Sequence, residues 1–488
     1  MASTQGPNDD DVFELLRQNV NPQVKEERER VVNQRLQAQQ EKAQKRLAEV
    51  IDSNSTLSVT ISSVKVLGAT HTRRGFLERI FNPLLSANQD RPYTLAEALK
   101  EVQIGADKLQ KFDIYFTVRE KSRILLKTGT DLGNAEGSAY GNLLWRNIFG
   151  GAETLNLNAS LGTRTRSAYS IGFETPVLSN PDFRWEIGGL ASSTQKSWAS
   201  HEEALKGVGT KFRWSNGAGN YELGLSGVWR QVTGLAGNAS PAVRHDAGDS
   251  FKSSITHTYI RERRDYPLLA SRGYFLKTVS EIAGWGPLRG DVAFWKSEIE
   301  SQAALSIPIP GISGDSGISL TTGLRAGLLY PLALSGESSP QPSRINDRFQ
   351  LGGPTDVRGF RLAGLGPRDG QDALGGDVYA AGSANLLFPF PRVGADKPLR
   401  LQAFINGGRL LALKNLGGEK IDGQAIKKSV KSTIAELGNG LPSLAAGVGI
   451  VYAHPVARFE LNFSLPLVLR RFEEGRKGLS FGVGINFL

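Results

Sequence analysis

The sequence lacks cysteine altogether and has a single methionine among its 488 residues. Without cysteine there can be no disulfide framework, no thiolate-ligated zinc or iron–sulfur site and no thiol nucleophile. Long apolar runs are also missing. The least charged stretch, residues 441–456, is interrupted by Pro442, Gly447, Gly449 and His454, whereas a spanning helix needs about 20 mainly apolar residues. A helical membrane protein is excluded, but a β-barrel is not, because its strands alternate over only about ten residues each.

Targeting signals and strong charge asymmetry are missing too. Residues 1–16 contain Asp9, Asp10, Asp11 and Glu14 but neither Lys nor Arg, so they match neither a secretory signal nor a transit peptide. The 58 Lys and Arg exceed the 48 Asp and Glu by 58 − 48 = 10 charges, spread along the chain. No nucleic-acid partner is expected from this modest excess.

Enzyme motifs are not found either. The five histidines form no HExxH motif, and there is no GxSxG or P-loop sequence, the arrangements that position a metal, a nucleophile or a nucleotide. Gly364, Gly366 and Gly370 miss the dinucleotide-binding spacing. The sequence therefore predicts no enzyme, no catalytic residue, no cofactor and no metal site.

What is present divides the chain into three regions. Residues 1–54 are polar, with mixed-charge helix formers over 24–48, and predict a solvated helix or a partly disordered arm. Residues 55–121 predict a small β-α-α-β module with strands over Ser58–Val66 and Ile114–Val118. Residues 122–488 contain no convincing helix and repeat strand-like segments between Gly, Pro, Asn and Asp clusters.

These segments are apolar on one side and polar on the other. In one of them Phe459, Leu461 and Phe463 alternate with Glu460 and Asn462. About 16 such strands fit the region, an even number within the range of transmembrane barrels. Lipid can cover an apolar face on every strand, which a small soluble core cannot. We predict a membrane all-β fold, an about 16-stranded transmembrane β-barrel preceded by one α/β domain. A soluble all-β binding protein is the alternative, and solubility without detergent would reveal it.

Two further features fit a barrel. Five tryptophans fall near strand ends or turns, where interfacial aromatics are expected: Trp145, Trp185, Trp229, Trp285 and Trp295. The longest connection, between strands near Ile318–Leu329 and Asp377–Phe388, contains Val357, Arg358, Gly359 and Phe360. It is either a glycine-rich external loop or a loop folded into the polar lumen. In the lumen, Arg358 would hydrogen-bond to the wall, Gly359 would allow close approach and Phe360 would pack.

The order of these features resembles the POTRA–barrel superfamily of outer-membrane insertases, over residues 55–488. The resemblance is carried by the module before the barrel, the Val-Arg-Gly-Phe loop, a hairpin signature over Arg264–Phe275 and a terminal polar-x-Gly-x-x-apolar-x-apolar pattern over Ser480–Phe487. Without a secretory signal, the chain is more similar to the mitochondrial branch, the central barrels of the sorting and assembly machinery, than to the bacterial branch.

The resemblance implies a location and partners. The module would be a POTRA domain in the intermembrane space, and the barrel would lie in the mitochondrial outer membrane among its lipids. Clients would be β-barrel precursor proteins that carry β-signal strands, and cytosol-facing metaxin-like accessory subunits would bind the barrel.

The sequence departs from the family pattern in two places. A third POTRA strand is shortened or absent near residues 112–115, which we interpret as missing residues. Bacterial relatives carry acidic residues where Asn385 and Asn406 stand, so neutral hydrogen bonds, or Asp377, are expected to hold Arg358 in place.

The seam between the first and last strands is the predicted lateral gate. We expect residues 123–134 to template a client strand and residues 478–488 to be exchanged out, since glycines on both strands leave little to lock their register. The gate residues on the first strand are Arg123, Leu125, Lys127, Gly129, Asp131 and Gly133. Those on the last strand are Ser480, Gly482, Gly484, Ile485 and Phe487. The alternative is a passive or protein-conducting channel whose seam stays closed.

Overall fold

The computed structural model describes residues 58–59, 72–79, 93–94, 122–133, 136–308, 316–334, 339–391, 398–414, 423–454 and 457–484. The chain forms two compact units, Met1–Thr70 with Leu77–Glu120, and His71–Phe76 with Lys121–Leu488. In the first unit β1 (Ser58–Val59) pairs antiparallel with β2 (Tyr93–Thr94). The predicted arm of residues 1–54, the strand over 114–118 and the region near 112–115 lie outside the described residues.

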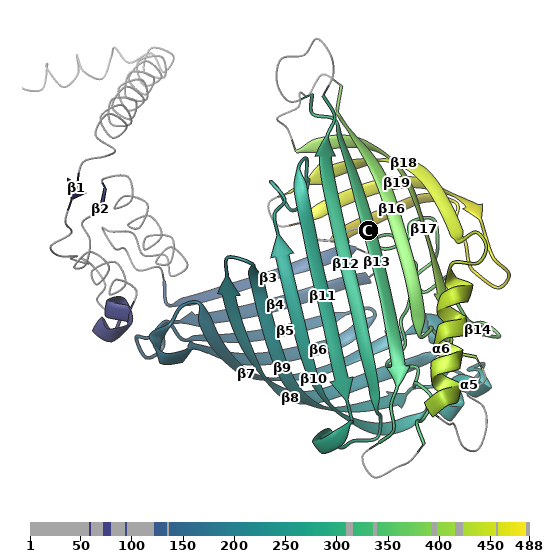
Figure 1. Ribbon diagram of the computed structural model, residues 1–488, viewed down its shortest axis with the longest axis horizontal. Coiled ribbons are helices and arrows are strands. Elements are labelled where there is room, and N and C mark those ends of the chain that lie inside the picture. The colour runs from purple at the N-terminus through teal and green to yellow at the C-terminus, as the bar shows by residue number, and fades with distance from the viewer. Residues whose placement is uncertain are drawn as a thin grey trace, which may run out of the picture. The chain divides into compact units, whose positions relative to one another are not determined.

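The second unit is built on one antiparallel sheet of 16 strands, in the order β20-β19-β18-β17-β16-β13 and then consecutively down to β3 (Figure 1). The number of strands matches the prediction. The strands are β3 (Ile124–Gly133), β4 (Glu136–Arg146), β5 (Thr154–Gly162), β6 (Thr165–Pro176), β7 (Phe183–Lys196), β8 (His201–Asn216), β9 (Gly219–Thr233), β10 (Gly248–Glu262), β11 (Gly273–Ala283), β12 (Phe294–Ser306), β13 (Ser319–Pro331), β16 (Val378–Pro389), β17 (Leu399–Leu411), β18 (Ser443–Ala453), β19 (Arg458–Val468) and β20 (Gly478–Gly484). Two short strands, β14 (Arg368–Asp369) and β15 (Asp372–Ala373), pair with each other between β13 and β16.

The strands alternate between two faces, as their sequences predict. On β13, Leu324 is 52% exposed on the outer face, whereas the neighbouring Arg325 points inward and forms an ion pair with Glu300 at 2.9 Å. On β19, Leu461 is exposed, while Glu460 and Asn462 are buried. The outer surface is therefore apolar and the lumen polar, which is the arrangement of a transmembrane barrel and not of a soluble sandwich.

Two helices interrupt the strands. Helix α5 (Pro241–His245) lies between β9 and β10, and α6 (Gly423–Leu437) lies between β17 and β18. The prediction that residues 122–488 contain no helix is wrong at α6. Ile426 and Val430 are both buried and lie one helical turn apart, but the two lysines and one serine between them hide this short apolar stripe in a chain dominated by period-two alternation. Among the described residues, none of the helices has the length and apolar character required to cross a bilayer.

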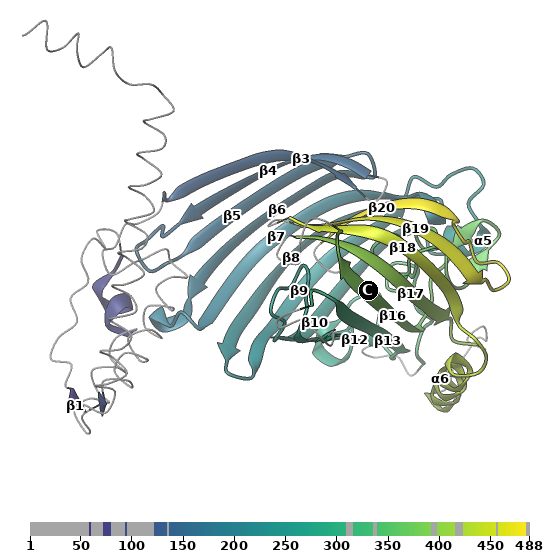
Figure 2. The same ribbon diagram turned by 90° about the horizontal axis from the view of Figure 1, so that it is seen from above.

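The two end strands of the sheet, β3 and β20, lie on the same side of the barrel and approach each other (Figure 2). β3 pairs with β4, and β20 pairs with β19 over Gly478–Gly484. Within the described residues no strand pairing joins β3 to β20. Each of these strands therefore has one edge without a partner strand.

Candidate functional site

The segment between β13 and β16 folds into the barrel. Its described residues 339–377, here called the lumenal loop, contribute Phe349, Leu351, Val357 and Phe360 to a buried apolar cluster with Tyr379 of the wall. The ring of Phe349 meets that of Tyr379 edge to face, with 4.8 Å between the ring centroids. The loop is thus a packed part of the lumen and not an external loop.

Arg358 lies at the centre of this loop and is completely buried. Its Nε donates to Oε2 of Glu460 at 2.9 Å and its Nη2 donates to Oε1 at 3.2 Å. A third donor, Nη1, reaches Oδ1 of Asn385 at 3.2 Å, and the guanidinium carbon lies 5.0 Å from the centre of the Phe404 ring. With its amide in the orientation that satisfies both of its polar atoms, Asn406 pairs with the backbone N and O of Arg358 at 2.9 and 3.0 Å. Side chains from β16, β17 and β19 therefore hold one arginine.

Glu460 is shared with the barrel wall. Its Oε1 also accepts from Nη2 of Arg458 at 2.6 Å, and its Oε2 accepts from Nδ2 of Asn462 at 2.8 Å and from Nε2 of Gln402 at 3.3 Å. One buried carboxylate is therefore opposed by two guanidinium groups. Bidentate, charge-assisted geometry of this kind fixes orientation as well as contributing energy.

Of the three predicted partners of Arg358, Asn385 and Asn406 do contact it. Asp377 does not fill this role, because its carboxylate accepts from the backbone N of Leu413 at 2.9 Å and from the hydroxyl of Ser343, at the mouth of the loop. A charge pair does exist, and Glu460 supplies it. The alternation on β19 places Glu460 on the polar face of the strand. This is the sequence signal that could have identified Glu460 as a lumenal partner of Arg358. Only the folded loop shows that Arg358 reaches this strand as well as β16 and β17.

The residues beside Arg358 are tightly placed. Gly359 has a φ of +85°, and a Cβ at this position would lie 2.6 Å from the Cβ of Ala445 on β18. Its carbonyl accepts from the backbone N of Arg476 at 2.8 Å, and Phe360 forms a β-bridge with Gly475. The loop is therefore attached both to β18 and to the turn that leads into β20.

The predicted gate residues lie on the two sheet edges. On β3, the lumenal face carries Leu125, Lys127 and Gly129, opposite in direction to the exposed Ile124 and Leu126. Arg123 precedes the strand, and its Nη2 donates to the carbonyls of Asn147 and Ile148 at 2.9 and 3.0 Å, so it anchors the β4–β5 connection and not the seam. Two gate residues are known only by register, since Asp131 pairs with Ser138 and Gly133 with Glu136.

On β20, the predicted gate residues Ser480, Gly482 and Gly484 pair with Asn462, Glu460 and Arg458 of β19. Asn462 and Glu460 are buried on the lumenal side of β19, so these β20 positions share the face of the Arg358 site. Ile485 and Phe487 lie outside the described residues.

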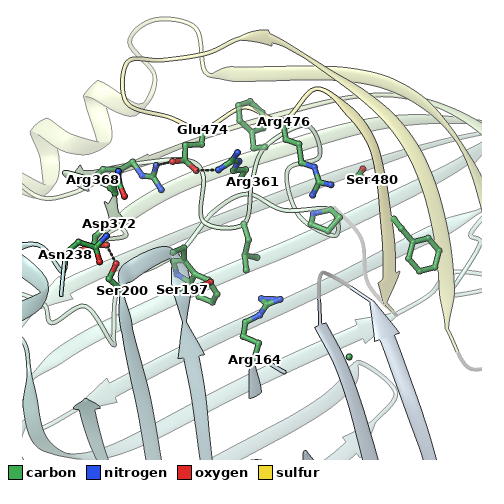
Figure 3. A pocket seen from close by; sticks show the side chains of 18 residues that line it. Arg164, Ser197, Ser200, Asn238, Arg361, Arg368, Asp372, Glu474, Arg476 and Ser480 are labelled. Carbon is green, nitrogen blue, oxygen red and sulfur yellow. Dashed lines mark hydrogen bonds and ion pairs between the residues drawn. The ribbon is translucent and has the colours of Figure 1, made fainter. Parts of the chain in front are cut away.

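A cavity of about 1370 Å³ lies beside the two edges. Its lining includes Gly137 of β4, Ser480 and Phe481 of β20, and Arg361 of the lumenal loop. Figure 3 shows Arg361 and Arg368 converging on Glu474, with which both form ion pairs. Space thus exists next to the seam, with the lumenal loop as its wall.

The loop also holds the opposite wall. Asp372 is 2% exposed and accepts from the hydroxyl of Ser200 at 2.5 Å (Figure 3). It also accepts from the backbone N of Ser240 at 2.7 Å. Asp369 accepts from the backbone N of Ala242 at 3.2 Å. The lumenal loop therefore spans the barrel, from the β9–β10 connection to β18 and β19.

The predicted mid-barrel signature forms the hairpin between β10 and β11. Asp265 accepts from the backbone N of Ser271 at 3.0 Å and of Arg272 at 3.2 Å. Gly273 has a φ of +98°, and a Cβ there would lie 2.1 Å from the carbonyl oxygen of Arg263. The Asp and Gly of this motif are therefore required by the geometry of the turn.

The fold and the site together define the class of this protein. It is a transmembrane β-barrel of 16 strands whose lumen holds a buried loop anchored by an arginine. Residues 147–487 match the model of the Omp85 superfamily domain. The chain is 39% identical to a "SAM50-like protein" of Schizosaccharomyces pombe, over 94% of this chain and 97% of the relative. It is 31% identical to the human "Sorting and assembly machinery component 50 homolog", over 79% of this chain and 77% of the relative. Among solved structures, BamA from Haemophilus ducreyi lacking POTRA domains 1–3 matches with a TM-score of 0.64 and 13% identity, over 87% of this chain and 85% of that one, and thus shares the fold.

The chain belongs to the Omp85 superfamily and, within it, to the family of sorting and assembly machinery component 50. The predicted family, the β-barrel fold and the mitochondrial outer-membrane location are thereby confirmed. The role of this family is β-barrel insertion, and its members are protein-insertion machinery and not, in general, enzymes. Among the described residues, no cluster of His, Asp or Glu is arranged to hold a metal ion.

Proposed function

We propose that this chain inserts β-barrel precursors through a lateral gate between β3 and β20, without a catalytic step. The observation that carries the proposal is that, over their described residues, β3 and β20 each have a sheet edge without a partner strand. In hydrocarbon, each unsatisfied backbone N–H or C=O costs several kcal/mol. A client strand that pairs with β3 would satisfy these groups, and the next strands of the client could follow by the same pairing.

The glycines of β20 support its role as the strand that exchanges. Gly482 and Gly484 offer no side chain to hold the register. A glycine-rich ladder is the cheaper one to exchange, so β3 is proposed as the fixed template.

The lumenal loop supports the other half of the mechanism. Its anchors fall on β16, β17, β18 and β19, through Asn385, Asn406, Ala445 and Glu460. These four strands precede β20 in the sheet. We infer that the loop keeps this wall of the barrel rigid while β20 leaves its place, and that the cavity beside the seam gives the client strand room on the lumenal side.

If this proposal holds, the partners of the chain are those that the family resemblance implies. Clients are β-barrel precursors with a terminal β-signal strand, metaxin-like accessory subunits bind on the cytosolic side, and the region of residues 55–121 is a POTRA domain in the intermembrane space. Residues 122–488 form the barrel.

Cysteine cross-linking tests the gate, because the chain has no native cysteine. Thr128→Cys with Phe481→Cys would join the two edges, whereas Thr130→Cys with Ala139→Cys joins β3 to β4, where these two positions are paired. Both double variants are expressed in place of the natural chain, and the insertion of a labelled barrel precursor is measured before and after oxidation. We expect oxidation to stop insertion only for the seam pair, and reductant to restore it.

The closed-seam channel makes the opposite prediction. If the seam pair is fully oxidised and insertion continues at the rate of the β3–β4 control, the lateral gate is wrong. A passive channel with a closed seam would conduct ions, and its conductance would not depend on Arg358.

A further inference from the structure

Helix α6 lies on the outer, membrane-facing surface of the barrel. Its Ile426 and Val430 pack against Val378 of β16 and Leu328 of β13, which are paired across the two strands. Leu328 shares its face of β13 with the exposed Leu324. The opposite face of β13 carries Arg325, which contacts Asp356 of the lumenal loop at 3.3 Å. The lumenal loop is therefore inside the barrel and α6 is outside it (Figure 1).

Arg409 attaches the carboxyl end of α6 to the strand beneath it. Its guanidinium Nη1 donates to the carbonyls of Glu436 and Asn439, the latter at 2.7 Å. The last carbonyls of a helix lack partners within the helix and favour a cation. The Glu436 carboxylate forms ion pairs with Lys414 at 2.5 Å and with Arg409 at 3.6 Å. The one acidic residue of α6 is therefore already neutralised.

The outward face of α6 is basic. Lys427, Lys428 and Lys431 are exposed, and within the described part of the chain none of them forms an ion pair or a side-chain hydrogen bond. Ile434 lies on the same exposed surface, at 49% exposure. Because the apolar stripe packs on the barrel, the surface that α6 offers to its surroundings consists of lysines and one large apolar side chain, and basic residues with an apolar neighbour suit the interface of an anionic membrane.

We propose that α6 binds the phosphate groups of anionic phospholipids, in the leaflet at the strand ends from which the lumenal loop enters. The helix covers the ends of β13 and β16, and the exposed Leu324 and Ile405 continue the outer surface toward the middle of the strands. Lipid headgroups must therefore lie next to α6. Lysine stems can extend along the apolar surface while their ammonium groups reach the phosphates.

An acidic protein partner is the competing occupant of this face, but the position favours lipid. Strand residues on the outer face directly below the helix are apolar and exposed, so a protein docked on α6 would need to displace lipid from them. The proposal depends on the membrane location of the barrel and not on the lateral gate.

The test uses the purified full chain in detergent, titrated with phosphatidylserine or with phosphatidylcholine of the same acyl chains, and counts bound lipid by native mass spectrometry. We expect phosphatidylserine to bind more tightly, with an affinity that falls as the salt concentration rises. Replacing all three residues, Lys427→Gln, Lys428→Gln and Lys431→Gln, should weaken phosphatidylserine binding at least about tenfold, because each lysine near an anionic surface contributes about a factor of five. Phosphatidylcholine binding should not change.

The matched control replaces the same three lysines with arginine. This variant keeps the charge and should bind phosphatidylserine like the natural chain, and the gel mobility of the unheated barrel reports whether each variant is folded. Single Lys→Gln substitutions provide the same comparison if the triple variant does not form the barrel. Unchanged phosphatidylserine binding in a folded Gln variant overturns the proposal. So does a Gln variant that keeps lipid binding but loses a copurifying acidic subunit, which would assign the face to a protein.

Discussion

The guanidinium of Arg358 and the carboxylate of Glu460 form a doubly hydrogen-bonded ion pair in which neither side chain is exposed. The two residues are 102 positions apart in the sequence, and their contact joins the lumenal loop to the strand next to β20. Because Glu460 also pairs with Arg458 at 2.6 Å, the site is a triad of one anion between two cations.

The triad predicts unequal costs for its members. Glu460→Gln removes the carboxylate that the Arg358 and Arg458 guanidinium groups share, and we expect it to lower the free energy of unfolding by about 3–5 kcal/mol. Arg358→Gln leaves Glu460 still paired with Arg458 and should cost less. Urea unfolding in detergent, followed by the gel mobility of the barrel, measures both. Equal costs for the two variants would contradict the triad.

Gly359 tests the close contact between the lumenal loop and β18. Gly359→Ala must adopt a φ of +85° and also place its Cβ 2.6 Å from that of Ala445, so we expect a loss of roughly 1–3 kcal/mol from overpacking in addition to backbone strain. Gly370→Ala is the control, because its φ is +61° and no atom lies within 4 Å of its added Cβ. Adding Ala445→Gly should recover part of the stability of Gly359→Ala but none of that of Gly370→Ala. The measurement is the same urea titration.

Asp265 should make the β10–β11 hairpin sensitive to acid. Burial tends to raise the pKa of its carboxyl, but hydrogen bonds from Ser271 and from the amide of Arg272 outweigh burial and hold the pKa below its usual range. A group whose pKa is depressed by folding adds stability above its unfolded pKa of about 4 and loses it as the pH falls through the folded value. Amide exchange of Ser271 and Arg272 should therefore accelerate relative to other turns as the pH is lowered from about 5 to 2. Asp265→Asn should remove this pH dependence, and its persistence in that variant would refute the assignment.

Asp372 should control how firmly the β9–β10 connection is held. Because its buried carboxylate accepts from Ser200 and from the backbone of Ser240, Asp372→Ala should cost about 1.5–3 kcal/mol locally. We expect faster proteolysis within residues 234–247, measured by mass spectrometry of the fragments. Asp369→Ala removes only the contact to Ala242 and serves as the control. Equal cleavage of the two variants would argue against a clamp at Asp372.

Much of the barrel can be predicted from its strands. On β19 every second residue from Phe459 to Leu465 is apolar, and the register places these residues outside and Glu460 and Asn462 inside. Asn385 and Asn406, which the family resemblance points to, both contact Arg358. The sequence points to Asp377 and not to Glu460 as a partner of Arg358. Alternation along a strand assigns a side chain to a face of the sheet, but it does not identify the residue that lies opposite a folded loop.

The sequence by itself determined the kind of solvent around this protein, since a strand of period two has one apolar face, and sixteen such faces need lipid. It also indicated the hairpin at Asp265, which is local in the chain. Only the tertiary structure decided that Arg358 meets Glu460, that α6 lies outside the barrel and that β3 and β20 do not pair with each other over their described residues. These contacts depend on how distant segments close around one lumen, and local backbone preference carries no information about that closure.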